Sequence, residues 1–132
     1  MIDLTGINYS AVIVATIIYY IIGFLWYSKL FGETWRKETG VAAELRPDPA
    51  ALIGQFASTF LYVFGIAIVL KLSGLEGIGG GFFAAAFVTI FFALSINSGN
   101  LFFTGKRKLY VIDVGERAVG SLVVGIILGL WP

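Results

Sequence analysis

The apolar positions of this chain fall into long uninterrupted runs, and these runs predict membrane-spanning helices. Residues 4–28, 49–70 and 77–105 contain no Asp, Glu, Lys or Arg. The hydrocarbon core of a bilayer is about 30 Å thick and is crossed by about 20 helical residues. Each run exceeds that length, so each is long enough to cross a membrane as a helix.

A fourth apolar run differs from the other three because it contains Asp113, Glu116 and Arg117. With it, the pattern predicts an all-α fold: an integral membrane bundle of four transmembrane helices in up-and-down order. The chain is then a single domain, residues 1–132, with helices at about residues 7–27, 49–70, 82–103 and 109–131. The first run lacks a basic start and a small-residue cleavage site, so we expect a retained helix rather than a signal peptide.

The connection between the first two helices, residues 29–40, places Phe31 and Trp35 one helical turn apart. This spacing suits a short interfacial helix, and a polar loop with two anchoring aromatic side chains fits it equally. Trp26, Tyr27 and Trp35 are expected at the level of the lipid headgroups, where amphipathic rings are enriched. Asp48 and Pro49 are typical of an N-cap followed by the first helical position.

Composition narrows the possible chemistry. The chain is 58% hydrophobic and only 13% charged, whereas soluble domains carry about 25% charged residues. It has no His and no Cys, which excludes imidazole acid–base catalysis, thiolate nucleophiles and Cys/His metal sites. We therefore expect no enzyme, no cofactor and no bound metal. The basic residues lie at the ends of the apolar runs, so nucleic-acid binding is not expected either.

The basic residues also predict an orientation. Seven of them lie in the first and third connections, and the second connection holds only Lys71; the seven are Lys29, Arg36, Lys37, Arg46, Lys106, Arg107 and Lys108. Lys and Arg are retained on the cytoplasmic side. The sequence thus predicts a multi-pass protein of the cell membrane (plasma or inner) with both termini extracytoplasmic.

Polar residues of all four helices are expected at one depth in the cytoplasmic half, given a rise of about 1.5 Å per residue. This intramembrane polar layer comprises Tyr19, Tyr20, Gln55, Thr59, Asn97, Asn100, Asp113, Glu116 and Arg117. In one interpretation Asp113 and Arg117, four residues apart on one helix face, form a structural pair, and Glu116 has no partner within the helix. In the other, the layer is a solvent-connected pocket for a proton, a cation or a small polar solute.

Small residues indicate where helices pack closely. We expect packing at Gly23, Gly54, Ser58, Gly125 and Gly129. The last two, with Gly77 and Gly81, favour close contact between the third and fourth helices, or alternatively a homodimer through the same grooves.

The run Gly23-Phe24-Leu25-Trp26-Tyr27-Ser28, followed by Leu30-Phe31-Gly32, Trp35, Lys37 and Gly40, resembles the N-terminal signature of a family of small prokaryotic membrane proteins. The ending Gly125-Ile126-Ile127-Leu128-Gly129-Leu130-Trp131 is similar to it as well. That family is known as domain of unknown function 1761. The resemblance implies a four-helix membrane protein and supplies no activity or site residues.

From these observations we expect a small polytopic protein that acts as an oligomeric or accessory subunit through contacts with other helices and with membrane lipids. Its partners would be copies of itself or a larger membrane complex. The alternative is a small homo-oligomeric transporter or channel that uses the polar layer around Glu116 and Arg117.

The expected orientation can be tested by thiol labelling, since the chain has no native cysteine. A cysteine added after Pro132 should react with an impermeant reagent in intact cells, and Thr39→Cys should react only after the membrane is opened. The reverse pattern would contradict the predicted orientation.

Overall fold

The computed structural model describes residues 3–42 and 46–132, and in those residues it contains helices and no strands. The elements are α1 (Tyr9–Leu25), the π-helical segment η1 (Trp26–Leu30), α2 (Gly32–Thr39), α3 (Pro49–Ser73), α4 (Gly77–Val88), the π-helical segment η2 (Thr89–Ala93), α5 (Leu94–Ile96), α6 (Ser98–Phe102) and α7 (Arg107–Leu130). The chain is thus a set of long apolar helices joined by short connections.

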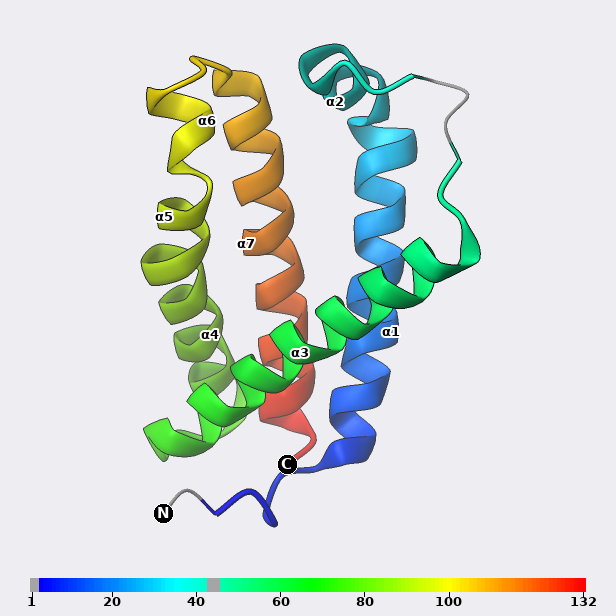
Figure 1. The fold of residues 1–132 in the computed structure, drawn as a ribbon. Helices are drawn as coiled ribbons and strands as arrows, with labels where there is room; N and C mark the ends of the chain where they lie inside the picture. The colour runs from blue at the N-terminus through cyan, green and yellow to red at the C-terminus, as the bar shows by residue number, and fades with distance from the viewer. Residues whose placement is uncertain (1–2, 43–45) are drawn as a thin grey trace.

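Helices α1, α4 and α7 stand side by side, with α7 between the other two (Figure 1). The α4–α7 contact is the closest, because glycines face each other in it. A Cβ atom at Gly81 or at Gly125 would overlap the backbone carbonyl of the other, and Gly129 lies equally close to Gly77. The close contact expected between these two segments is therefore present within one chain.

Helix α3 crosses this layer obliquely (Figure 1). In an up-and-down bundle it would run alongside the other helices, but it begins beside the middle of α1 and ends near the start of α4. Its buried residues, Thr59, Val63, Ile66 and Ala67, all lie in the C-terminal part, and residues 49–58 are exposed throughout. With α4 and α7 closed against each other through glycines, α3 packs across the layer rather than within it.

Local sequence signals explain where the helices begin. Asn8 accepts a hydrogen bond from the backbone N–H of Ala11 at 3.1 Å and so caps α1. Asp48 caps α3 through the N–H of Ala51 at 2.7 Å, as its position before Pro49 predicts. The expected short helix between the first two long helices is α2.

The third apolar run forms an interrupted helix. Its helical structure begins at Gly77, five residues before the expected start at 82. It passes through the π-helical segment η2, then breaks at Asn97, whose backbone has φ −87° and ψ 0°. Such interruptions leave backbone groups outside the regular α-helical pattern and often accompany functional sites.

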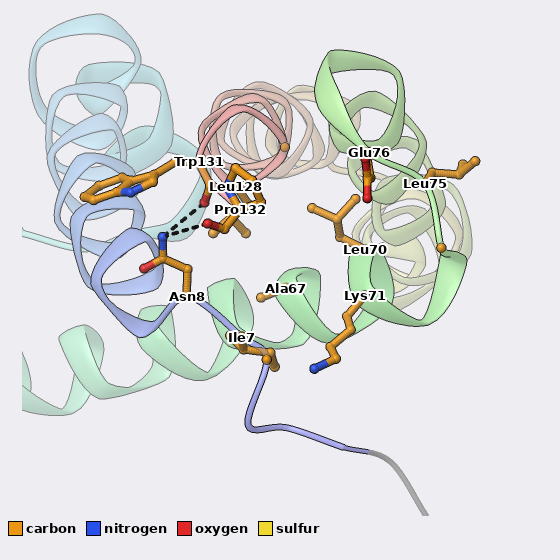
Figure 2. A pocket seen from close by; sticks show the side chains of 13 residues that line it. Ile7, Asn8, Ala67, Leu70, Lys71, Leu75, Glu76, Leu128, Trp131 and Pro132 are labelled. Atoms are coloured by element: carbon orange, nitrogen blue, oxygen red, sulfur yellow. Dashed lines mark hydrogen bonds between the residues drawn. The ribbon is translucent and has the colours of Figure 1, made fainter.

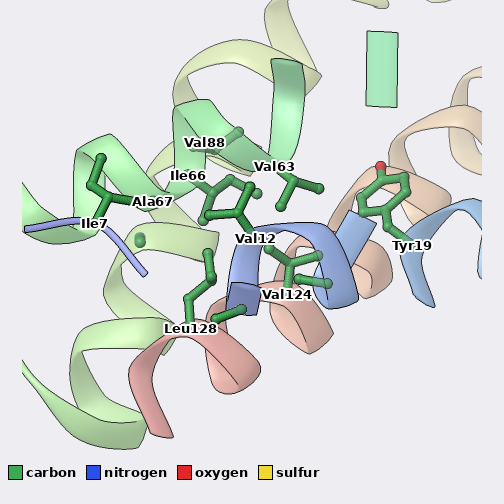
Figure 3. Packing of buried hydrophobic residues seen from close by; sticks show 12 residues of the cluster. Ile7, Val12, Tyr19, Val63, Ile66, Ala67, Val88, Val124 and Leu128 are labelled. Atoms are coloured by element: carbon green, nitrogen blue, oxygen red, sulfur yellow. The ribbon is translucent and has the colours of Figure 1, made fainter. Parts of the chain in front are cut away.

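The core lies where α3 crosses α1, α4 and α7 (Figure 3). Apart from Tyr19 and Leu128 it is built from alanine and β-branched residues: Ile7, Ala11, Val12, Ala15, Val63, Ile66, Ala67, Ala84, Val88 and Val124. Tyr19 lies at one edge of this cluster (Figure 3). The core therefore ends where the expected polar layer begins.

The outer surface is apolar. Ile53, Phe91 and Val111 are 70%, 63% and 66% exposed, as side chains that face lipid are. Within the described part of the chain, three helical segments are long and apolar enough to cross a membrane: Tyr9–Leu30, Pro49–Ser73 and Gly77–Ile96. The apolar helices indicate a protein embedded in a membrane.

The α4–α7 contact can be tested with two glycines of α4. Gly81→Ala should lower the thermal unfolding temperature in detergent, because the methyl group meets the Gly125 backbone, and overpacking typically costs about 1–3 kcal/mol. Gly79→Ala is the matched control, because nothing lies within 4 Å of a Cβ there and alanine favours the helix by up to about 1 kcal/mol. Equal unfolding temperatures for the two variants would contradict the contact.

Candidate functional site

The site is built where α1 and η1 meet the charged half of α7. Tyr19 donates a hydrogen bond from its hydroxyl to Glu116 Oε2 at 3.2 Å, and Tyr27 donates to Asp113 Oδ1 at 2.8 Å. The indole of Trp26 donates to the backbone carbonyl of Ile112 at 2.9 Å. Three aromatic side chains of one helix thus hold one face of α7.

Arg117 joins this network from the same helix. Its Nε lies 3.7 Å from Glu116 Oε2, and one of its terminal nitrogens donates to the Tyr19 hydroxyl at 3.2 Å. Its guanidinium carbon is 4.8 Å from the centre of the Tyr62 ring, a cation–π distance. The Tyr19 hydroxyl therefore bridges the two charges, donating to the carboxylate and accepting from the guanidinium.

This arrangement corrects the expected pairing of Asp113 with Arg117. The partner of Arg117 is Glu116, and Asp113 is instead held by Tyr27 and by Asn100, whose Nδ2 lies 3.5 Å from Asp113 Oδ2. Spacing along one helix allows either carboxylate to reach the guanidinium, and hydroxyl and amide donors on neighbouring helices decide between them.

The two members of the pair differ in burial. The Glu116 side chain is 5% exposed and that of Arg117 is 37% exposed. Every buried side-chain nitrogen and oxygen among the described residues has a hydrogen-bond partner. The network is therefore internally satisfied, with its acid inside and its base at the edge of an open space.

That open space is a cavity of about 550 Å³. It is lined by Tyr19, Tyr20, Gly23, Phe24, Tyr27, Trp35, Pro47, Leu52, Gln55, Thr59, Asn97, Asp113, Glu116 and Arg117. Eight of the nine residues expected in the intramembrane polar layer are among them. The ninth, Asn100, lies behind Asp113 as its hydrogen-bond donor.

The remaining members of the layer enter from α1, α3 and the interrupted helix. Tyr20 lies over α3, with its hydroxyl 3.5 Å from the Leu52 carbonyl oxygen. Thr59 and Asn97 each donate to the carbonyl four residues earlier, at Gln55 and Ala93. Their polar groups are thus partly committed to their own helices and line the cavity without joining the charged network.

The residues expected to pack helices have different surroundings. A Cβ at Gly23 would lie 3.3 Å from Glu116 Oε1, so this glycine admits the carboxylate. Gly125 and Gly129 lie inside, against α4. Gly54 and Ser58 are exposed, and nothing lies within 4 Å of a Cβ at Gly54.

Four polar contributors to the site lie outside the expected layer: Trp26 and Tyr27, which the sequence places at the headgroup level, and Tyr62 and Ser121. Tyr62 contacts the Arg117 guanidinium, and its hydroxyl is hydrogen-bonded to Ser121 Oγ at 2.8 Å. Ser121 follows Arg117 by one helical turn, which places it on the same face. That spacing is the signal that would have found it, since Ser121 is fully buried in an apolar stretch.

A second, smaller cavity of about 260 Å³ lies at the opposite end of the bundle. Figure 2 shows it between the starts of α1 and α4 and the ends of α3 and α7. Its Asn8 side chain donates to the backbone carbonyls of Trp131 and Pro132, both at 3.3 Å. Lys71 and Glu76 are the charged residues among its described lining, and no ion pair joins them there, so the larger cavity with its charged network is the candidate functional site.

The polar groups that line the larger cavity are carboxylates, hydroxyls, amides and one guanidinium. Across residues 3–42 and 46–132, no group of three His, Cys, Asp or Glu side chains is gathered as a metal site requires. The arrangement suits reversible recognition of a polar or charged group by hydrogen bonds and ion pairing.

Comparison with known families matches residues 10–129 to the family described as "Protein of unknown function (DUF1761)". Neither the curated proteins nor the solved structures compared with the chain give a match. The family match covers both helices of the charged network and all the residues that line the cavity.

The pairing within the network can be tested by a double-mutant cycle measured as thermal stability in detergent. Arg117→Met should be destabilising, because it leaves the buried Glu116 carboxylate without its counter-charge. Since the Arg117 side chain is 37% exposed, the loss should be smaller than the loss of about 3–5 kcal/mol typical of fully buried pairs. Combining it with Glu116→Gln should recover part of that loss. The stability losses of Arg117→Met and Asp113→Asn should add when the two changes are combined. If Asp113→Asn recovered part of the Arg117→Met loss instead, Asp113 would be the partner of Arg117, as helical spacing predicts.

Proposed function

This chain belongs to the DUF1761 family of proteins of unknown function, and we propose from its cavity that it is a small membrane transporter that binds a solute between α1, α3 and α7. The observation that carries the proposal is the convergence of Asp113, Glu116 and Arg117 on one cavity of about 550 Å³. Ligand sites are typically cavities of about 300–1,000 Å³ with a few convergent polar groups. Ionisable side chains within a membrane are costly, so they usually mark substrate or ion pathways.

The proposal includes α7 as a fourth transmembrane helix of the expected bundle. It has 24 residues and would be about 36 Å long at 1.5 Å per residue. Its charged side chains face α1 and α3, while Val111 and Val119 on other faces are 66% and 42% exposed. This distribution supports a span whose charges are kept from lipid by the rest of the bundle.

The interrupted helix supports transport over a purely structural role. Asn97, where the helix breaks, lines the cavity, and η1 begins directly before Tyr27. Discontinuous helices often form the substrate sites of transporters, because their irregular backbone is tolerated where it lines a cavity. The same breaks provide positions about which segments can tilt.

The orientation in this proposal is the one that the basic residues predict. Trp35 and Pro47, which lie in the first connection, line the cavity, so the site would open toward the cytoplasm. The amine of Lys106 donates to the Glu38 carbonyl oxygen at 2.7 Å and joins the first and third connections at this end. Both termini would then be extracytoplasmic in a cell membrane.

A hydrated cavity predicts different reactivity for two neighbouring positions of α3. Gln55→Cys should react rapidly with a charged methanethiosulfonate reagent in inside-out vesicles, because a thiol in water can ionise. Ile53→Cys should react slowly, since that side chain is 70% exposed on the outer surface and does not line the cavity. Similar rates at the two positions would contradict a water-accessible site.

A second candidate function is that of an oligomeric or accessory subunit, and the exposed start of α3 favours it. Residues 49–58 are exposed throughout, and among them Gly54 and Ser58 do not line the cavity; small or polar residues on an outer helix face typically mark helix–helix contacts in membranes. A second copy of the chain, or another membrane subunit, would cover this surface in addition to lipid.

Native mass spectrometry of the purified protein tests the oligomer. Gly54→Leu should shift the population toward monomer without lowering monomer stability, because nothing lies within 4 Å of a Cβ there. Leu61→Ala is the control, as this side chain is 67% exposed on the same helix outside the segment. A parent protein that is monomeric at every concentration would rule out a homo-oligomer through this surface.

A further inference from the structure

The charges that line the larger cavity do not cancel. The lining contains two carboxylates, those of Asp113 and Glu116, and one guanidinium, that of Arg117. Glu116 and Arg117 are paired at 3.7 Å, and both are also hydrogen-bonded to Tyr19. Their charges therefore compensate each other, which leaves the carboxylate of Asp113 as the net charge of the cavity.

Asp113 lies in an aromatic environment. Its hydrogen-bond donor Tyr27 packs edge-on against Trp35, with ring centres 5.7 Å apart. Tyr20 packs edge-on against Phe56 of α3 at 5.6 Å. A cation within about 6 Å of such a ring face is attracted by the quadrupole of the ring, and the attraction is stronger when both are desolvated. Aromatic rings and an excess carboxylate together favour a cationic ligand.

The rim of the cavity adds an apolar component. Phe24 and Leu52 line it and are 66% and 44% exposed. They provide a surface for an apolar body next to the charged group, which a hydrated inorganic ion would not use. An anion would meet the excess carboxylate, and that contact is repulsive.

We propose that the cavity takes a monovalent organic cation with an apolar body, such as a quaternary ammonium or phosphonium compound, with Asp113 as its counter-ion. This assignment rests on the proposed function of the cavity as a solute site. It names the class of solute and separates the roles of the two acids: Glu116 compensates Arg117, and Asp113 recognises the ligand.

Isothermal titration of the full-length protein in detergent tests the assignment with three probes. Tetraphenylphosphonium is the cation, tetraphenylborate is an anion of similar size and shape, and glycine betaine is a small zwitterion. We expect saturable binding of tetraphenylphosphonium at one per chain, and no saturable binding of the other two.

Two variants and their controls connect the binding to named residues. Asp113→Asn should weaken tetraphenylphosphonium binding at least about tenfold through loss of the counter-ion, and Glu33→Gln, which removes an exposed carboxylate of α2, should leave it unchanged. Trp35→Leu should weaken it about tenfold, and Trp35→Phe, which keeps an aromatic ring, should restore most of it. Circular dichroism on each variant separates lost binding from lost fold.

The outcomes distinguish a wrong assignment of the ligand class from the absence of a solute site. Saturable binding of tetraphenylborate or betaine but not of tetraphenylphosphonium would overturn the cationic assignment and leave a solute site standing. Tetraphenylphosphonium binding that Asp113→Asn leaves unchanged in a folded protein would overturn the role of Asp113. Absence of binding by all three probes, together with an unreactive Gln55→Cys, would overturn the site itself.

Discussion

The carboxylate of Glu116 constrains the arrangement of the helices around it. An ionised group in an apolar interior is tolerated only when it is paired and hydrogen-bonded, and here α7 cannot supply both requirements alone. Arg117 supplies the opposite charge, and Tyr19 on α1 supplies the hydroxyl that contacts both. Gly23, one turn further along α1, leaves the space that the carboxylate occupies. The register between α1 and α7 follows from these contacts.

The opposite side of α7 is held by a different kind of contact. Gly77 and Gly81 of α4 lie against Gly129 and Gly125, so that backbone meets backbone. Close packing of this type stabilises membrane helices without any hydrophobic driving force between them. Because α7 is pressed against α4 at its glycine-rich half, its charged half is left to face α1 and α3. The cavity lies beside this charged half, where the N-terminal part of α3 has not yet reached the layer.

The sequence predicts most polar residues of the site, but it does not predict which acid pairs with Arg117. Depth along four helices was sufficient to place Gln55, Thr59 and Asn97 near the charged residues, since the rise of a helix fixes depth. Which acid meets Arg117 depends on side-chain donors of other helices, and helical spacing carries no information about those. The oblique path of α3 was missed for a related reason. Hydropathy measures suitability for a membrane, and the C-terminal half of α3 is apolar around its whole circumference, so the sequence does not indicate which face packs there or at what angle.

The hydrogen bonds from Tyr19 and Tyr27 to α7 have a consequence for how such a protein is made. A central Asp or Arg opposes insertion of an isolated helix by about 2.5–3.5 kcal/mol, and α7 carries Asp113, Glu116 and Arg117 in addition to the two basic residues at its start. The ribosome completes α1, α3 and α4 before α7 emerges, so the hydroxyls of the two tyrosines are already present as hydrogen-bond donors for the carboxylates of Glu116 and Asp113. With α7 as the proposed fourth span, its entry into the membrane is a docking step onto helices that are already in place, and the order of the helices along the gene becomes part of the folding mechanism.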